Sequence, residues 1–242
     1  MKTIGVIPAR YASTRLKAKV LADIQGKPMI QHVWERAQKS LLLDDLLIAC
    51  DDPLIVEVAR RFGAKAVLTS PDHPSGSDRI AEAVKDLAID AVVNIQADEP
   101  LITPGIIDGL VEALKDDHTC RMATVIKVLT EESELKDPNV VKVVIDQDHN
   151  ALYFSRAPVP HNRNPMGIPG GSYKHLGLYA YRKDFLMTFV RLPRGELERR
   201  EGLEQLRALE AGYKIKTVLT DTPTLSVDTP ADLRRVCELL SS

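Results

Sequence analysis

Residues 4–19 read Ile4-Gly5-Val6-Ile7-Pro8-Ala9-Arg10-Tyr11-Ala12-Ser13-Thr14-Arg15-Leu16-Lys17-Ala18-Lys19. The apolar run that ends at Ile7 is typical of a buried strand, and the segment after Pro8 carries four cations in ten positions. Open α/β sheets bind ligands beyond the carboxyl ends of their strands. The basic segment therefore leaves the first strand where a ligand is expected.

This basic loop lacks the pattern Gly-x-x-x-x-Gly-Lys-Ser/Thr of a P-loop. The side chains of Arg10, Arg15 and Lys19 would then supply the charge that a P-loop supplies through backbone amides. We interpret the loop as a triphosphate-binding loop. A solvated basic loop is the alternative that charge alone leaves open, and the position after a strand favours the triphosphate.

The rest of the N-terminal half alternates between strand and helix patterns. Apolar runs predict strands at residues 46–50, 66–68 and 91–95. Helices are expected from Pro28, from about Pro53 to Gly63, through residues 80–87 and at 104–115. This alternation predicts an α/β fold with a mainly parallel, right-handed sheet.

After residue 120 the pattern changes. Strands are expected at 122–128 and 140–145, and a turn at 146–150 leads to a strand at 151–154, so a hairpin is predicted. A long loop (156–173), a strand (176–181), helices (185–190 and 203–209), a strand (215–219) and a helix with Thr229 as N-cap follow. We expect one domain over 1–242, in which about 120–182 include the smaller hairpin region.

Composition excludes several classes of protein. The 32 basic and 34 acidic side chains leave a net charge of −2, so no global field attracts nucleic acid. Three cysteines without a Cys-x-x-Cys pair argue against a disulfide framework and a zinc site. No signal-type segment or run of membrane-spanning length is present, so we expect a soluble, cytoplasmic protein without a membrane partner.

Two carboxylates are candidates for a metal site. Asp98 follows the strand at 91–95 on the sheet edge where the basic loop lies, and one or two carboxylates with phosphate oxygens are how proteins hold Mg²⁺. Asp228, before the last helix, is the second candidate. A turn residue at Asp98 and a helix-capping role for Asp228 are the alternatives.

Other polar residues give weaker signals. Ser75-Gly76-Ser77-Asp78-Arg79 opens a helix with hydroxyls, flexible backbone and a cation that suit a base or phosphate, and Ser77 or Asp78 is expected to cap that helix. Four residues stand beside apolar runs, where satisfied surface or core residues are the ordinary expectation: Arg156, His175, Glu204 and Gln205. No Gly-x-Ser-x-Gly or His-Glu-x-x-His pattern occurs.

Several motifs together resemble those of the 3-deoxy-manno-octulosonate (Kdo) cytidylyltransferases. They are Ile7 to Leu16, Gly26-Lys27-Pro28-Met29-Ile30, Ser75 to Arg79, Asn94-Ile95-Gln96-Ala97-Asp98-Glu99-Pro100, Ala151 to Arg156, Lys174-His175-Leu176-Gly177, Leu203-Glu204-Gln205-Leu206-Arg207 and Val227-Asp228-Thr229-Pro230. The first is shared loosely by many sugar nucleotidyltransferases. The resemblance covers the whole chain.

The resemblance implies a Rossmann-like nucleotidyltransferase fold that dimerises through the hairpin region. It implies Mg²⁺-dependent transfer of CMP from CTP to Kdo, which gives CMP-Kdo and pyrophosphate for lipopolysaccharide biosynthesis. By this resemblance, Arg10, Arg15 and Lys19 hold triphosphate and act in catalysis with the metal ligands Asp98 and Asp228. The nucleotide is further contacted by Pro8, Ala9, Ser75, Gly76, Ser77, Arg79 and Gln96. Kdo is contacted by Arg156, His175, Glu204 and Gln205.

Two departures and two alternatives accompany the resemblance. Ala18-Lys19-Val20 stands where relatives often have Gly-Lys-Pro, and Ser226 stands where a glycine is usual. The loop at 161–173 leaves 8-amino-Kdo open as the acceptor. A nucleotide-sugar-dependent glycosyltransferase usually carries an Asp-x-Asp metal pair after the nucleotide-binding half. Here the fourth strand leads into Gln96-Ala97-Asp98-Glu99, and Asp146-Gln147-Asp148 falls in a predicted hairpin turn, which counts against this alternative.

Overall fold

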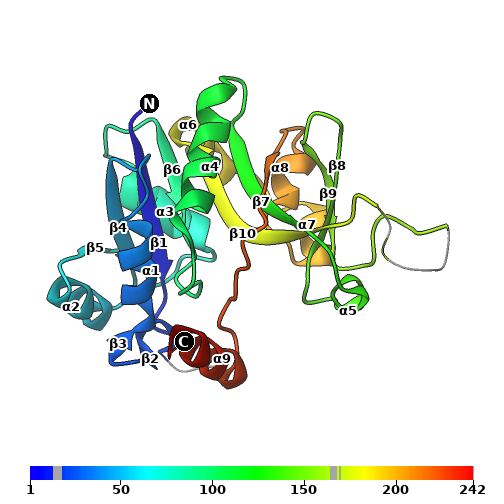
Figure 1. Cartoon of the computed structure of the whole chain (residues 1–242). Coiled ribbons are helices and arrows are strands. Elements are labelled where there is room, and N and C mark those ends of the chain that lie inside the picture. The colour runs from blue at the N-terminus through cyan, green and yellow to red at the C-terminus, as the bar shows by residue number, and fades with distance from the viewer. Residues whose placement is uncertain (13–17, 164–167, 169, 242) are drawn as a thin grey trace. The chain divides into compact units, whose positions relative to one another are not determined.

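The computed structural model describes residues 1–12, 18–163, 168 and 170–241. They form two compact units, Met1–Val111 with Thr222–Ser242, and Glu112–Asp221 (Figure 1). The helix α4, Pro104–Asp116, carries the chain from the first unit to the second. The expectation of one domain over 1–242, with a smaller region at about 120–182, stays a prediction.

The first unit is built on a parallel sheet in the order β6, β1, β4, β5. Its strands are β1 (Thr3–Ala9), β4 (Asp45–Cys50), β5 (Lys65–Leu68) and β6 (Ala91–Asn94). β1 and β6 are buried almost throughout, which explains their continuous apolar sequences, because a parallel sheet is covered on both faces. The predicted parallel core of an α/β fold is confirmed.

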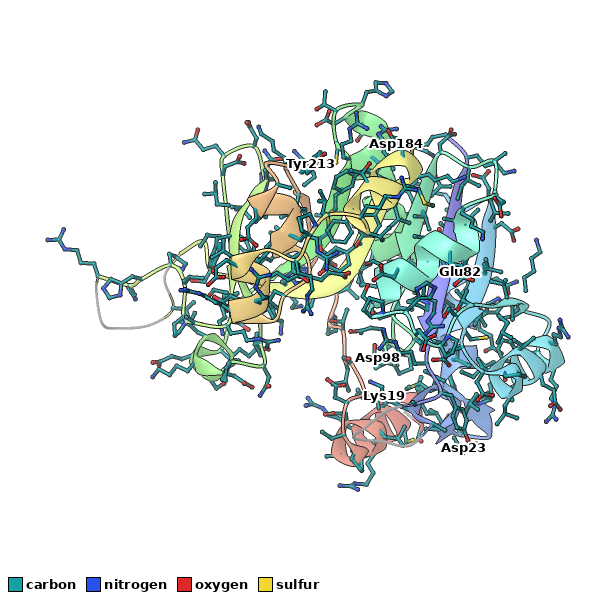
Figure 2. All side chains as sticks on the ribbon, turned by 180° about the vertical axis from the view of Figure 1, so that it is seen from behind. Lys19, Asp23, Glu82, Asp98, Asp184 and Tyr213 are labelled. Atoms are coloured by element: carbon teal, nitrogen blue, oxygen red, sulfur yellow. The ribbon has the colours of Figure 1, made fainter. Side chains whose placement is uncertain are left out.

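Helices connect these strands. They are α1 (Met29–Ala37), α2 (Pro53–Arg61) and α3 (Gly76–Val84). α1 covers the face of the sheet that is seen in Figure 1, and α3 covers the opposite face, seen in Figure 2. The carboxyl ends of β1 and β6 therefore open between two helical layers.

Short elements complete the first unit. The 3-10 turn η1 (Lys19–Leu21) precedes a two-stranded antiparallel ribbon of β2 (Asp23–Ile24) and β3 (Lys27–Pro28). The last helix, α9 (Pro230–Ser241), packs Val236 against Ile24 and Met29. This packing holds the C-terminal segment against the elements that follow the basic loop.

Helix ends follow the expected chemistry, with one correction. Pro53 stands at the first position of α2, and Gly63 after it has the left-handed φ of 85°. The helix α3 begins at Gly76, before either expected cap, and its N-cap is Ser75, whose hydroxyl accepts a hydrogen bond from the Asp78 amide. The expected cap at Ser77 or Asp78 is therefore wrong, because an N-cap accepts from an amide two or three residues later.

The second unit mixes strand directions. Its strands are β7 (Met122–Val128), β8 (Lys142–Ile145), β9 (Ala151–Ser155), β10 (Tyr173–Arg182) and β11 (Lys216–Leu219). β11 runs parallel to β7, whereas β10 is antiparallel to β7 and β8. β8 and β9 pair antiparallel, so the predicted hairpin is confirmed.

The helices of the second unit are α5 (Glu132–Lys136), α6 (Lys183–Phe189), α7 (Glu196–Glu201) and α8 (Leu206–Glu210). α6 buries Phe185 and Phe189, and α8 buries Leu206. In the described part of the chain, no helix has the length and apolar character that crossing a bilayer requires.

Candidate active site

A cavity of about 380 Å³ opens in the first unit where β1 and β6 end. It is lined by Pro8, Arg10, Ala12, Lys19, Val20, Gly76, Arg79, Gln96, Ala97, Asp98 and Asp228. Most of these residues are predicted to contact a nucleotide or a metal, and they come from four distant parts of the chain. The structure brings them to one cavity, and their contacts with a ligand stay a prediction.

The basic loop begins at the exposed Arg10. The guanidinium of Arg10 donates to the carbonyl oxygen of His73 at 2.9 Å, and the Tyr11 amide donates to Asp51 Oδ1 at 2.9 Å. The loop therefore starts with two anchors on segments that follow β4 and β5. Arg15 lies outside the described residues.

Lys19 connects the two predicted metal ligands. Its Nζ lies 2.7 Å from Asp98 Oδ2 and 3.1 Å from Asp228 Oδ1, and Figure 2 shows Lys19 beside Asp98. Burial alone would lower the pKa of Lys19, but the two carboxylates raise it above its usual value. The ammonium is therefore charged and neutralises part of the negative charge of the pair.

Asp228 does not cap α9. The Asp232 carboxylate accepts from the backbone amides of Asp228 and Thr229, at 3.1 and 2.8 Å, and Thr229 Oγ1 accepts from the Asp232 amide at 3.2 Å. Thr229 and Asp232 thus share the capping of the helix, as in a capping box. The Asp228 carboxylate is directed to Lys19 instead.

The pair of Asp98 and Asp228 fits a divalent cation. An ammonium already lies between the two carboxylates, so this place in the cavity favours positive charge. Within the ranges that the structure describes, no group of three or more His, Cys, Asp or Glu side chains forms a metal site. Two carboxylates suit Mg²⁺ that completes its coordination with phosphate oxygens and water.

Glu99 is a buried carboxyl that the sequence analysis did not single out. Burial, together with the negative charges of Asp98 and Asp228, raises its pKa to about 8. Its Oε2 has no hydrogen-bond partner among the described residues. Since Glu99 follows Asp98 directly, it contributes a neutral carboxyl at neutral pH beside the charged pair.

The start of α3 forms another wall of the cavity. Gly76 approaches Pro8 closely, because a Cβ at this position would lie 3.4 Å from the Pro8 ring. Ser75 is half-buried at the N-cap, and Ser77 is fully buried. Ala9 is buried within β1 and is not among the residues that line the cavity.

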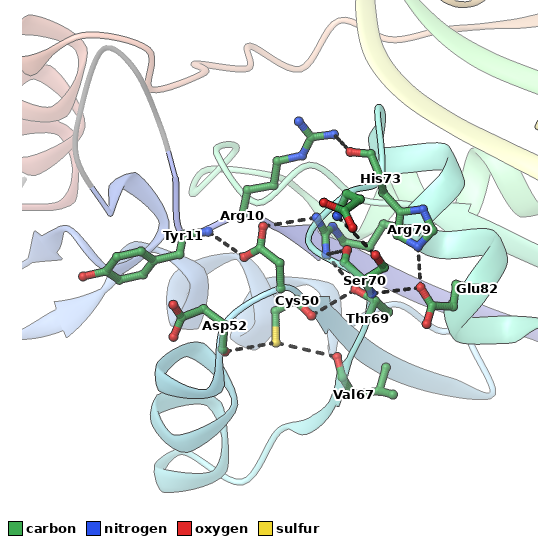
Figure 3. A network of polar contacts seen from close by, with 12 residues as sticks. Arg10, Tyr11, Cys50, Asp52, Val67, Thr69, Ser70, His73, Arg79 and Glu82 are labelled. Atoms are coloured by element: carbon green, nitrogen blue, oxygen red, sulfur yellow. Dashed lines mark hydrogen bonds and ion pairs between the residues drawn. The ribbon is translucent and has the colours of Figure 1, made fainter.

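Arg79 is a buried cation in the same wall (Figure 3). Its NH1 donates to Thr69 Oγ1 at 2.6 Å and to the Ser70 carbonyl at 3.3 Å, and its NH2 donates to Asp51 Oδ2 at 3.2 Å. Its Nε is buried and has no hydrogen-bond partner among the described residues. Burial lowers the pKa of Arg79, and the charge of Asp51 opposes that shift.

The four predicted acceptor residues all belong to the second unit. Arg156, directly after β9, donates from Nε to the Glu201 carbonyl at 2.7 Å and from its amide to Glu201 Oε2 at 2.8 Å. The Glu201 carboxylate also accepts from Ser155 Oγ at 2.7 Å. The last residue of α7 therefore fixes the end of β9, including Arg156.

His175 lies on β10 with its ring among aromatic side chains. Its ring packs edge-on to Phe154, with centroids 4.9 Å apart, and its Nε2 lies 2.9 Å from Thr124 Oγ1. Burial lowers the pKa of His175 to about 3, so the imidazole is neutral near pH 7. The ring can donate or accept a hydrogen bond, but it presents no positive charge to a ligand.

Glu204 and Gln205 lie between α7 and α8. Glu204 is half-buried, and its charge contributes to raising the pKa of the buried Tyr179, after burial itself and Tyr181. Gln205 is buried, and its Nε2 has no hydrogen-bond partner among the described residues.

Comparisons with known proteins give the family. A model of the family described as "Cytidylyltransferase" matches residues 4–215. The 3-deoxy-manno-octulosonate cytidylyltransferase of Syntrophobacter fumaroxidans is 50% identical, with 100% of this chain and 98% of that protein covered. That of Syntrophus aciditrophicus is 49% identical, with 99% and 97% covered.

A solved structure gives the same result. The structure of a CMP:2-keto-3-deoxy-manno-octonic acid synthetase complexed with CTP matches with a TM-score of 0.95 and 42% sequence identity. The match covers 100% of this chain and 99% of the other. With this likeness in sequence and fold, the chain belongs to the 3-deoxy-manno-octulosonate cytidylyltransferase family of nucleotidyltransferases.

Proposed function

We propose that the protein transfers CMP from CTP to Kdo with the help of Mg²⁺ and releases pyrophosphate. The observation that carries this proposal is the cation that Lys19 places between Asp98 and Asp228 in a cavity at the end of the parallel strands. The names of the relatives support the choice of CTP and Kdo. The product would be CMP-Kdo, a precursor for lipopolysaccharide.

The nucleotide would occupy the cavity of the first unit. Arg10 and Lys19, with Arg15, would neutralise the triphosphate, and Arg79 with the start of α3 would face the cytosine. In-line attack on a phosphoryl group needs charge neutralisation and positioning more than a protein nucleophile. The presence of buried and half-buried cations in one cavity supports this assignment.

Asp98 and Asp228 would hold Mg²⁺. A bound Mg²⁺ would polarise the α-phosphate and lower the pKa of the acceptor hydroxyl. When Lys19 leaves the carboxylates, its ammonium is free to bind phosphate oxygens. The two carboxylates would thus bind the Lys19 ammonium before the metal arrives and Mg²⁺ afterwards.

The acceptor would bind to residues of the second unit. Kdo is an acid with several hydroxyls, so Arg156 suits its carboxylate and His175, Glu204 and Gln205 suit its hydroxyls. Glu201 supports this role of Arg156 because it fixes both the amide and Nε of that residue. We further propose that the protein is a cytoplasmic homodimer that associates through the β8–β9 hairpin region.

Pyrophosphate release tests the proposal. Purified protein is assayed with Mg²⁺ and CTP, UTP or ATP, each with Kdo, 8-amino-Kdo or sialic acid. We expect fast release only with CTP and Kdo, and none after chelation of the metal. Faster release with 8-amino-Kdo than with Kdo would make 8-amino-Kdo the acceptor. Absence of release with every pair of nucleotide and acceptor would overturn the proposed function.

A further inference from the structure

One carboxylate supports two parts of the nucleotide cavity. Asp51 follows β4 directly, and its side chain is only 11% exposed. Oδ1 accepts from the Tyr11 amide at 2.9 Å, and Oδ2 accepts from Arg79 NH2 at 3.2 Å. The start of the basic loop and the Arg79 guanidinium are therefore fixed by the same group (Figure 3).

The other contacts of Arg79 leave its orientation dependent on Asp51. NH1 is held by Thr69 and Ser70, both from the segment after β5, and among the described residues NH2 is paired with Asp51 alone. A guanidinium that is held at both ends is fixed in its plane, and its remaining N–H groups then point in defined directions. The buried Nε, which lacks a partner among the described residues, is one such group.

We propose that Asp51 is a positioning residue that sets the nucleobase preference of the cavity by orienting Arg79. This inference rests on the proposed binding of CTP in this cavity. Cytosine presents two adjacent acceptors, O2 and N3, whereas N3 of uracil carries a hydrogen. A fixed row of N–H donors therefore favours cytosine, and a guanidinium that is free to rotate loses this distinction.

Asp51 also links base recognition to the triphosphate loop. The Tyr11 amide that it holds follows Arg10, which lines the same cavity. Loss of the negative charge at residue 51 should weaken both ends of the nucleotide site but leave the acceptor site, which belongs to the second unit, unchanged.

The matched pair of variants is Asp51→Asn and Asp52→Asn. Asp52 is the next residue in the chain, and its carboxylate caps α2 by accepting from the Leu54 amide at 2.8 Å. Asparagine is an equally good N-cap, so Asp52→Asn changes the same charge without loss of the cap. It controls for the change in charge and for general effects on this loop.

The affinities for CTP and UTP are measured by calorimetry, and kcat and KM are measured for both nucleotides and for Kdo. We expect Asp51→Asn to weaken CTP binding and lower the preference for CTP over UTP, each by about tenfold, since a charge-assisted hydrogen bond is lost. The KM for Kdo should stay unchanged, and Asp52→Asn should behave as the wild type. An unchanged preference in folded Asp51→Asn protein would overturn the role of Asp51.

A second variant covers the case in which Asp51→Asn does not fold. Asp51→Glu keeps the charge but moves the carboxylate by one methylene, so it should fold and still lose preference for CTP. If its preference is that of the wild type, the inference is wrong. If the wild type turns over CTP and both Asp51 variants keep its preference for CTP over UTP, only this inference is refuted. If the wild type neither binds nor uses CTP, the proposed function is refuted as well.

Discussion

The backbone amide of Val227 donates a hydrogen bond of 2.9 Å to the carbonyl oxygen of Asp98. Val227 is fully buried and packs with Ile24 and Met29, so the C-terminal segment is fixed where it meets the segment after β6. Asp228 is held beside Asp98 by this backbone contact as well as by Lys19. The spacing of the two carboxylates is therefore a property of the folded backbone, set before any metal binds.

Asp98→Asn should remove most of the turnover and leave the fold intact. The substitution replaces a proposed metal ligand, which is charged, by a neutral side chain, and a bound metal would supply several kcal/mol of stabilisation of transition-state charge, so kcat should fall by about two orders of magnitude or more. Pyrophosphate release at saturating CTP and Kdo measures this. Asp86→Asn, at an exposed position, is the control. Near-normal pyrophosphate release by Asp98→Asn would show that Asp98 is not a metal ligand.

Lys19→Met should bind a divalent cation more tightly in the absence of nucleotide. In the proposed site the ammonium and the metal would compete for Asp98 and Asp228, and removal of the ammonium leaves two carboxylates without their counter-charge. Titration with Mn²⁺, without CTP, measures the affinity directly. Lys27→Met, which removes a cation that is paired with Glu35 on the surface, is the control. Equal or weaker Mn²⁺ binding by Lys19→Met would show that the ammonium and the metal do not compete.

The sheet of the first unit could be predicted because its strands are short apolar runs that end at turn residues. β1 ends at the Pro8-Ala9 pair, and two aspartates directly follow β4. The helix α7 was missed because Glu196–Glu201 has almost no apolar residues. Its buried Glu198 is instead neutralised by Arg207 on α8, and periodicity does not reveal such an ion pair.

The candidate site was predicted in part. Asp98 and Asp228 stand where a strand ends and a helix begins, so their positions in the sequence gave a signal. Asp51 and Glu99 also follow strands, but each stands beside another carboxylate in a turn, and sequence alone does not tell what each of the two neighbours contacts. Only the contacts of Asp51 with Tyr11 and Arg79 distinguish it from Asp52.

His175 should make the protein less stable in acid. Its pKa is about 3 in the folded protein and near 6.5 when unfolded, so the unfolded state takes up the proton first as the pH falls. The stability that neutral His175 provides is full above pH 6.5 and is lost as the pH falls towards 3. Between pH 7 and 5 the free energy of unfolding should fall by about 2 kcal/mol from this group alone. Denaturant unfolding at both pH values measures this, and His175→Gln should lack this part of the loss.

Gly202→Ala should destabilise the second unit. Gly202 ends α7 with a φ of 63°, in the left-handed region where a side chain is strained. We expect a loss of about 1 kcal/mol in the free energy of unfolding, measured with denaturant. Gly105→Ala is the control, because Gly105 lies in the first turn of α4 with an ordinary φ and open space around it. A Gly202→Ala protein as stable as the control variant would contradict the prediction.

Glu201→Gln should impair the acceptor site alone. The Glu201 carboxylate accepts hydrogen bonds from Ser155 and from the Arg156 amide. Burial alone would raise the pKa of Glu201, but these hydrogen bonds and the charge of Arg156 lower it below its usual value. A neutral amide keeps the size of the side chain but weakens these bonds, so the backbone at Arg156 should be held less firmly, although the guanidinium keeps its bonds to the carbonyl oxygens of Glu201 and Pro138. The KM for Kdo should therefore rise, by at most about tenfold. The KM for CTP should not change, because the nucleotide cavity is lined by residues of the first unit.

Glu196→Gln, on the same helix with its carboxylate on the surface, is the control and should match the wild type in both constants. A rise in the KM for CTP alone would place Glu201 outside the acceptor site.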